Sequence, residues 1–269
     1  MIQIVTLDDP RVADYARVGD PVWLRGQGLF VAEGRLLVRR LFETKTFPVR
    51  SVLVTPVALR AMEDVIDSDR CPIYVCEQRI MDDLAGFNFH RGCLALGERP
   101  AASEPIDRLA RARCLLALEG VGNPDNVGGL FRAAAALGGG GVLLDQKCGD
   151  PLYRKAIRTS MGAVFCLPFS IADDWLSTIR MLRDGGADVI ALTPDSSARL
   201  LAELARDRSP DRRLVLLLGA EGPGLSTEAL AVATASMRIP ISRVVDSLNV
   251  VVAAGIALAA LARPDEISG

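Results

Sequence analysis

The sequence predicts an α/β protein whose larger, C-terminal part is built on a parallel sheet. Short apolar runs alternate with segments of helical spacing along most of the 269 residues. The run at residues 214–218 is apolar throughout, which is typical of a central parallel strand covered on both faces. This alternation predicts a sheet that presents ligands at the carboxyl ends of its strands.

The composition narrows the class of protein. Half of the residues are hydrophobic and 24% are charged, which predicts a folded chain. The longest apolar run, residues 250–262, is too short to span a bilayer, and the first residues carry no basic region followed by an apolar core. We therefore expect a cytoplasmic protein without a membrane segment. The formal net charge of −2 means that any RNA binding must depend on local basic patches.

Cysteine and histidine usage predicts no metal site. The chain has one histidine, and its cysteines form no CxxC pair, so a zinc site would need ligands from distant segments. Most of the cysteines lie in apolar stretches, where they behave as small hydrophobic residues. They are Cys71, Cys76, Cys93, Cys114, Cys148 and Cys166.

A break in composition divides the chain into two predicted domains. Residues 98–111 include polar, small and proline residues and predict a linker between a domain at 1–97 and a domain at 112–269. In the first domain, Asp9 is expected to cap a helix that begins at Pro10. The remaining elements predict a small three-layer α/β fold: helices at 30–42 and 56–66, and strands at 51–54, 73–76 and 93–96.

The second domain continues the alternation with stronger signals. An apolar run at 164–167 precedes a helix at 173–182. The other predicted strands are 114–118, 141–144, 189–192 and 214–218, and the other predicted helices are 126–137, 150–162 and 248–262.

The first loop of chemical interest covers residues 119–132. Its glycines invite a dinucleotide-binding interpretation, but Asp125 stands where the third glycine of GxGxxG is required. Asn126 is a good helix cap, and Arg132 is expected to lean back over Gly129 and Gly128, so that its guanidinium could reach the loop. A glycine-rich turn followed by a surface arginine is an equally good interpretation.

Two further loops follow later strands. In residues 218–226, glycines and a proline fix the backbone path, Ser226 is expected to cap the next helix, and Glu221 stands where such a sheet presents ligands. A tight turn with an exposed glutamate is the alternative. In residues 237–254, Ser247 is a natural cap for the last helix, whereas Asn249 interrupts apolar sequence and is expected to have a specific partner.

Taken together, the three loops resemble the signature motifs of the SpoU (SPOUT-class) RNA 2′-O-ribose methyltransferases. The matching elements, in family order and spacing, are Asn126 with Arg132 six residues on, Gly-Ala-Glu-Gly-Pro-Gly at 219–224, and Ile239-Pro240 followed by Ser247-Leu248-Asn249-Val250. The likeness covers about residues 112–263. Residues 28–54 look like the small ribosomal-protein-like α/β/α domain that often precedes the catalytic domain. Ile241 and Val251 depart from the family, which usually has methionine and a small polar residue there.

The resemblance implies S-adenosylmethionine as methyl donor, a C-terminal trefoil knot, and a homodimer in which the partner subunit completes each site. Backbone groups at Gly219, Ile239 and Leu248 would hold the adenosine. Arg132 would bind phosphate and stabilise the developing oxyanion, because a guanidinium is a poor base at neutral pH. The residues that orient Arg132, the ribose and the loops would be Asn126, Glu221, Ser247 and Asn249. The apolar face of the last helix is expected to contribute to the dimer interface.

RNA contact is expected from two basic clusters, although such charge runs often form only a solvated face. The first domain carries Arg35, Arg39, Arg40, Lys45 and Arg50, and the catalytic domain carries Arg154, Lys155 and Arg158. The accessory domain favours ribosomal RNA over tRNA as substrate. His90 is expected to be structural or to face solvent.

Two alternatives come from other classes of protein. A nucleotide-dependent oxidoreductase on a doubly wound sheet is disfavoured by Asp125. A non-catalytic RNA-binding relative that keeps the fold is disfavoured by the intact motif residues Asn126, Arg132, Glu221, Ser247 and Asn249.

Overall fold

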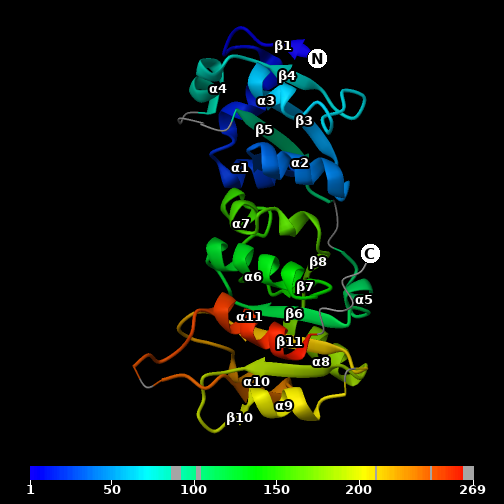
Figure 1. Cartoon of the computed structure of the whole chain (residues 1–269), viewed down its shortest axis with the longest axis vertical. Helices are drawn as coiled ribbons and strands as arrows, with labels where there is room; N and C mark the ends of the chain where they lie inside the picture. The colour runs from blue at the N-terminus through cyan, green and yellow to red at the C-terminus, as the bar shows by residue number, and fades with distance from the viewer. Residues whose placement is uncertain (86–91, 101–103, 210, 243, 263–269) are drawn as a thin grey trace. The chain divides into compact units, whose positions relative to one another are not determined.

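The computed structural model describes residues 1–85, 92–100, 104–209, 211–242 and 244–262 (Figure 1). The chain forms two compact units: unit 1 comprises residues 1–102 and 151–166, and unit 2 comprises residues 103–150 and 167–269. His90 lies outside the described residues. Within them, no helix is long and apolar enough to cross a membrane.

Unit 1 contains a mixed five-stranded sheet with the strand order β1-β4-β3-β5-β2. Strands β1, β4 and β3 are parallel, and β5 runs antiparallel to both β3 and β2. The strands are β1 (Ile2–Gln3), β2 (Leu29–Glu33), β3 (Val49–Val54), β4 (Ile73–Val75) and β5 (Cys93–Glu98).

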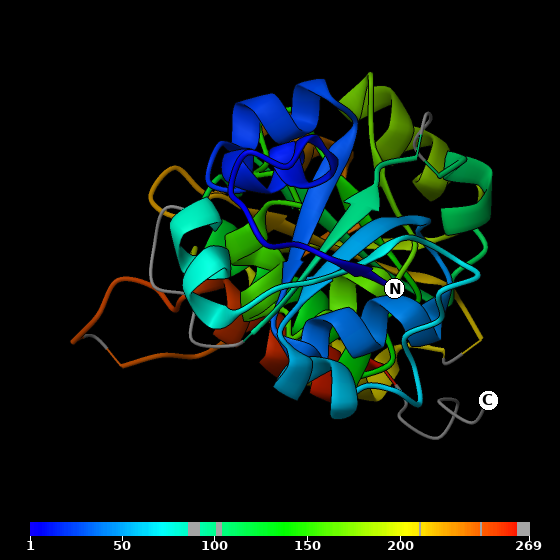
Figure 2. The ribbon, with the colours of Figure 1, turned by 90° about the horizontal axis from the view of Figure 1, so that it is seen from above.

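Helical segments cover both faces of this sheet, which confirms the predicted three-layer arrangement. Leu29 and Val31 of β2 belong to a core with η1, α1 and α4, whereas the intervening Phe30 packs on the other face against Phe47 and Phe165. Figure 2 shows η1 and α1 on one side of the strands and α2 and α3 on the other. These elements are the 3-10 helix η1 (Pro10–Arg17), α1 (Pro21–Gly26), α2 (Arg35–Thr44), α3 (Pro56–Arg60) and α4 (Gln78–Ala85).

Residues 151–166 pack within unit 1, although the sequence prediction included them in the catalytic domain at 112–269. They contain α7 (Arg154–Thr159) and the short 3-10 helix η2 (Ala163–Phe165). The ring of Phe165 is fully buried, with its centroid 5.7 Å from that of Phe30. Arg40 Nη1 donates a hydrogen bond to the carbonyl oxygen of Met161 over 2.7 Å. The compact units therefore do not follow the predicted domain boundary at this segment.

Unit 2 contains a seven-stranded sheet in which every pair of neighbouring strands is parallel, in the order β10-β12-β9-β11-β6-β7-β8. This confirms the parallel-sheet class. The strands are β6 (Cys114–Glu119), β7 (Val142–Leu144), β8 (Phe169–Ile171), β9 (Asp188–Leu192), β10 (Arg199–Leu200), β11 (Leu214–Gly219) and β12 (Ala235–Arg238).

The central strand β11 explains the two layers around the sheet of unit 2. Its residues Val215 and Leu217 share a core with α8 and α10, and the alternate residues of β11 face the side where α11 packs against both β11 and α6. The helices are α5 (Ile106–Leu109), α6 (Pro124–Ala136), α8 (Trp175–Asp184), α9 (Leu201–Asp207), α10 (Thr227–Val232) and α11 (Val250–Leu261).

Several predicted elements of the chain were wrong in type or extent. The predicted helix at 30–42 is strand β2 followed by helix α2, separated by Gly34 at a φ of 91°. The predicted helix at 56–66 ends as an α-helix at Arg60. The apolar run at 164–167 overlaps the 3-10 helix η2 at Val164 and Phe165. The predicted helix at 150–162 forms only over α7, with Tyr153 at its N-cap.

Candidate active site

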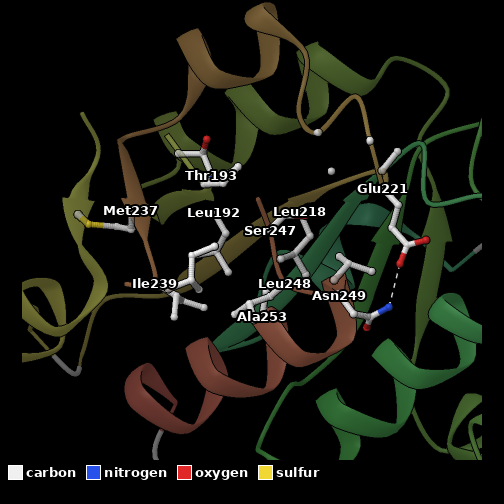
Figure 3. Close-up of a pocket in the computed structure, with 17 residues that line it drawn as sticks. Leu192, Thr193, Leu218, Glu221, Met237, Ile239, Ser247, Leu248, Asn249 and Ala253 are labelled. Carbon is white, nitrogen blue, oxygen red and sulfur yellow. Dashed lines mark hydrogen bonds between the residues drawn. The ribbon is translucent and has the colours of Figure 1, made fainter. Parts of the chain in front are cut away.

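A cavity of about 410 Å³ lies where β9, β11 and β12 end, at the carboxyl edge of the unit 2 sheet (Figure 3). Its walls are largely apolar and include Leu192, Leu218, Met237 and Leu248. All three predicted cofactor positions, Gly219, Ile239 and Leu248, line this one cavity. Their role in binding a cofactor stays a prediction, but three separate segments of the chain do meet here.

The loop after β11 folds tightly against itself beside the cavity. The N–H of Gly224 donates a hydrogen bond to the carbonyl oxygen of Ala220 over 3.0 Å. A Cβ atom added at Gly219 would lie 2.2 Å from the carbonyl carbon of Gly224, so no larger residue fits there. Ser226 caps α10 by accepting a hydrogen bond from the N–H of Ala229, as predicted.

Three of the predicted catalytic residues form one hydrogen-bonded junction. Asn249 Nδ2 donates to Asn126 Oδ1 over 3.0 Å and to Glu221 Oε1 over 2.8 Å, while the N–H of Val251 donates to Asn249 Oδ1 over 2.9 Å. Both N–H donors and the oxygen of the Asn249 side-chain amide are thereby engaged within the protein. Glu221 and Asn249 lie together at one end of the cavity (Figure 3), and this junction links the three motif loops.

Two of the predicted helix N-caps were wrong. Asn249, and not Ser247, is the N-cap of α11. Asn123, and not Asn126, is the N-cap of α6, where its side chain accepts from the N–H of Asp125. Asn126 is instead buried in the first turn of α6, and this position lets its side chain meet Asn249.

Close packing of α6 on α11 makes this junction possible. A Cβ atom at Gly129 would lie 2.7 Å from Val251 Cγ2 and 3.0 Å from Cγ1, so the bare backbone of Gly129 receives the Val251 side chain. Arg132 was expected to lie over that bare surface, which is wrong for Gly129. The departure of Val251 from the family's small polar residue therefore has a structural role in this chain.

Arg132 and Ser247 do not join the junction. Arg132 is exposed, and within the part of the chain that the structure describes its guanidinium has no hydrogen bond or ion pair to the protein. Ser247 is exposed and lines the cavity. Arg132 is therefore a cation that remains available for a ligand.

Two carboxylates that were not predicted accept hydrogen bonds from the loops at the carboxyl edge of the sheet. Glu119, the last residue of β6, accepts hydrogen bonds from both the N–H and the hydroxyl of Ser226. Asp145, which is buried after β7, accepts from the N–H groups of Gly120 and Lys147. An acidic residue at the carboxyl end of a parallel strand was the available signal for both.

The predicted RNA-binding cations fall into two groups. Arg35, Lys45 and Arg158 are exposed, and the described residues offer none of them a hydrogen bond or ion pair. The other predicted cations form contacts within unit 1 or are partly buried. Arg39 pairs with Asp64 over 2.6 Å, and Arg40 donates a hydrogen bond to Met161. Arg50 lies 3.4 Å from Asp14, Arg154 lies 3.7 Å from Glu33, and Lys155 is half-buried.

The buried cysteines behave as apolar residues. Burial raises the pKa of both Cys93 and Cys114 to about 12, so these thiols stay protonated at neutral pH. Among the residues that the structure describes, no three His, Cys, Asp or Glu side chains are grouped so as to hold a metal ion.

Comparison with known proteins identifies the family. Residues 113–259 match the SpoU rRNA Methylase family, which is more than half of the chain. A relative from Mycobacterium tuberculosis, described as an uncharacterized tRNA/rRNA methyltransferase, is 36% identical over 254 residues that cover 93% of this chain and 88% of the relative. The chain belongs to the SpoU rRNA Methylase family.

Two solved structures share the fold. An AdoMet-bound rRNA methyltransferase from Sinorhizobium meliloti has a TM-score of 0.81 and 24% identity, with 99% of this chain and 98% of that chain covered. An RNA 2′-O ribose methyltransferase has a TM-score of 0.74 and 23% identity, with 97% and 98% covered. The SpoU chain described here is thus an RNA methyltransferase of that family, and the oxidoreductase alternative does not hold.

Replacing Gly129 with alanine tests the close packing of α6 on α11. Alanine normally stabilises a helix interior by about 0.5–1 kcal/mol relative to glycine. Here the added methyl group meets both methyl groups of Val251, so we expect Gly129→Ala to lower the free energy of unfolding in urea by roughly 1–3 kcal/mol.

Two matched variants complete this test. Val251→Ala combined with Gly129→Ala should recover part of the lost stability, because it removes the overlapping methyl groups. Gly26→Ala in α1 should stabilise the protein, because nothing lies within 4 Å of its added methyl group and α1 is not part of the packing of α6 on α11. A stabilising Gly129→Ala would contradict the packing described above.

Proposed function

We propose that this SpoU family protein transfers a methyl group from S-adenosylmethionine to a ribose 2′-hydroxyl of RNA, with ribosomal RNA favoured over tRNA. The observation that carries the proposal is the junction of Asn126, Asn249 and Glu221, which joins the three motif loops at one end of the cavity. The ribosomal preference is supported by the family's description and by the small domain that precedes the catalytic one.

The cavity is suited to S-adenosylmethionine. Its volume of about 410 Å³ lies within the usual range for small-molecule pockets, about 300–1,000 Å³. Apolar side chains such as Leu218, Ile239 and Leu248 can pack against a purine, and the Glu221 carboxylate at one end suits a cationic ligand. Gly219, Ile239 and Leu248 would hold the adenosine through their backbone groups. When bound, S-adenosylmethionine supplies an electrophilic methyl group.

The residues of this chain divide the remaining work. Arg132 is exposed, and its guanidinium is free to bind phosphate or a developing oxyanion. Both N–H donors of the Asn249 side chain are used within the protein, and they fix the positions of Glu221 and Asn126. Ser247 lines the cavity with its hydroxyl available to the substrate or cofactor.

A homodimer is part of the proposal. Helix α11 leaves Val252 and Ile256 exposed, at 50% and 41% of their surfaces, and Val244 and Val245 of the preceding loop are exposed as well. An exposed apolar group of this kind beside a site is typical of a protein–protein contact. A second copy of the chain would cover it and complete the site. The C-terminal trefoil knot that the family resemblance implies also stays a proposal.

Substitution of Arg132 distinguishes a role in methyl transfer from a role in binding S-adenosylmethionine. Arg132→Ala should lower the rate of methyl transfer to RNA by roughly 10²–10³-fold, the effect of losing an oxyanion stabiliser, while the affinity for S-adenosylmethionine stays near that of the wild type. Arg132→Lys should recover little activity, because it lacks the planar fork. Single-turnover transfer of labelled methyl groups and calorimetry measure the two quantities.

Arg180→Ala is the matched control for Arg132. Arg180 is an exposed arginine of α8, which covers the face of the unit 2 sheet opposite to α6 and α11. Arg180→Ala should leave both the rate of methyl transfer and the affinity for S-adenosylmethionine unchanged. Near-normal turnover of Arg132→Ala would refute the assigned role, and a wild-type protein that binds NAD but no S-adenosylmethionine would refute the methyltransferase proposal itself.

The free cations of unit 1 are expected to contact RNA. Arg35→Ala and Arg158→Ala should each weaken RNA binding and make its salt dependence shallower by about 0.7–0.9 in log–log slope, the value for one phosphate contact. Arg39→Ala should leave that slope unchanged, because the Arg39 guanidinium is already paired with Asp64. A slope equal to that of the wild-type protein in both Arg35→Ala and Arg158→Ala would mean that these two cations do not contact RNA.

The dimer is tested by mass in solution. Sedimentation should give roughly 58 kDa, twice the chain mass of 28.8 kDa. Ile256→Asp should yield monomers, since an unpaired charge in an apolar interface is costly, whereas the exposed Val57→Asp in α3 should not. A wild-type monomer with full activity would overturn the shared site.

A further inference from the structure

We propose that Glu119 is a positioning residue for cofactor binding, acting through Ser226 on the loop that lines the cavity. Glu119 ends β6 directly beside Gly219, the last residue of β11. Its Oε2 accepts the N–H of Ser226 and its Oε1 accepts the Ser226 hydroxyl, both over 2.8 Å. Hydrogen bonds to an ionised carboxylate are among the stronger ones in proteins.

The two hydrogen bonds from Ser226 to Glu119 fix the end of the loop that lines the cavity. The loop departs from β11 at Gly219 and reaches helix α10 at Ser226, so a shift of Ser226 moves the short segment between them. Gly219, Glu221 and Gly224 of that segment line the cavity. The position of the Ser226 backbone therefore sets the shape of this wall.

The carboxylate is not needed to hold the surrounding elements together. Strands β6 and β11 already pair in register from Leu214 with Cys114 to Gly219 with Glu119. Ser226 caps α10 through its own hydroxyl, which accepts the N–H of Ala229 over 3.1 Å. Glu119 adds a restraint only beyond the strand ends, on the loop itself, so its contribution falls mainly on the cavity.

The inference rests on the proposed function only in that the ligand of the cavity is S-adenosylmethionine. The test uses the full-length protein and calorimetric titration with S-adenosylhomocysteine, the stable demethylated product, well below the melting temperature of every variant. Glu119→Ala should weaken binding roughly tenfold to a hundredfold, the range for losing hydrogen bonds to a charged group. Glu119→Gln, which keeps one acceptor oxygen and the shape, should weaken it less.

Two further variants distinguish positioning from mere stabilisation. Asp174 forms the same pair of hydrogen bonds, to the N–H and hydroxyl of Ser177 in α8, and does not line the cavity. Asp174→Ala should lower the melting temperature and leave the affinity unchanged. Adding Ser226→Ala to Glu119→Ala should weaken binding by less than the sum of the two single effects, because Ser226→Ala already removes one of the two hydrogen bonds that Glu119 accepts and leaves only the one from the N–H.

Each other outcome overturns the inference. Wild-type affinity in Glu119→Ala, or an equal loss in Asp174→Ala, would mean that Glu119 has no positioning role although the cofactor proposal stands. Full additivity of Glu119→Ala and Ser226→Ala would mean that Glu119 does not act through Ser226. No binding by the wild-type protein would instead refute the cofactor proposal and remove the ligand on which this role depends.

Discussion

The contact between Gly129 and Val251 is the constraint on which the site depends. A single methyl group at Gly129 would meet both methyl groups of Val251 and force α11 away from α6. The amide of Asn249, at the start of α11, reaches Asn126 in α6 because the two helices are this close, and its second N–H donates to Glu221. The Asn126 side chain is buried, and leaving its oxygen without the Asn249 donor would cost about 1–3 kcal/mol, so packing and polar contacts support each other.

The cavity wall is braced from two directions. At its outer end, Asn249 ties Glu221 of the loop after β11 to Asn126 of α6. At its base, Glu119 ties Ser226, where the same loop ends, to the last residue of β6. Since ligand sites in parallel sheets are made of loops, such cross-links compensate for the lack of regular structure and limit the rearrangement needed on binding. Arg132 is left outside both braces, exposed to solvent and available to a substrate.

The sequence predicted the parallel sheet and the residues that meet at its edge, because uniformly apolar strands and glycine-rich turns are local signals. Long-range packing was beyond it. Phe165 lies in an apolar run that the sequence assigns to the catalytic domain, yet its ring is buried against Phe30 in unit 1. The helix caps were misassigned by two or three residues because several Asn and Ser side chains could serve, and only the tertiary partners of Asn126 and Asn249 decide among them. Glu119 carries no motif of its own, since its partner lies 107 residues further along the chain.

Mapping of ribose methylation in cellular RNA tests directly whether this protein methylates a ribose 2′-hydroxyl. RNA from a strain that lacks the gene would be compared with RNA from the same strain supplied with the wild-type chain or with Arg132→Ala. We expect that one ribose, in ribosomal RNA, loses its resistance to alkaline cleavage in the deletion strain and recovers it with the wild-type chain alone. Identical ribose maps in all three strains, or a methyl group lost from a base, would contradict it.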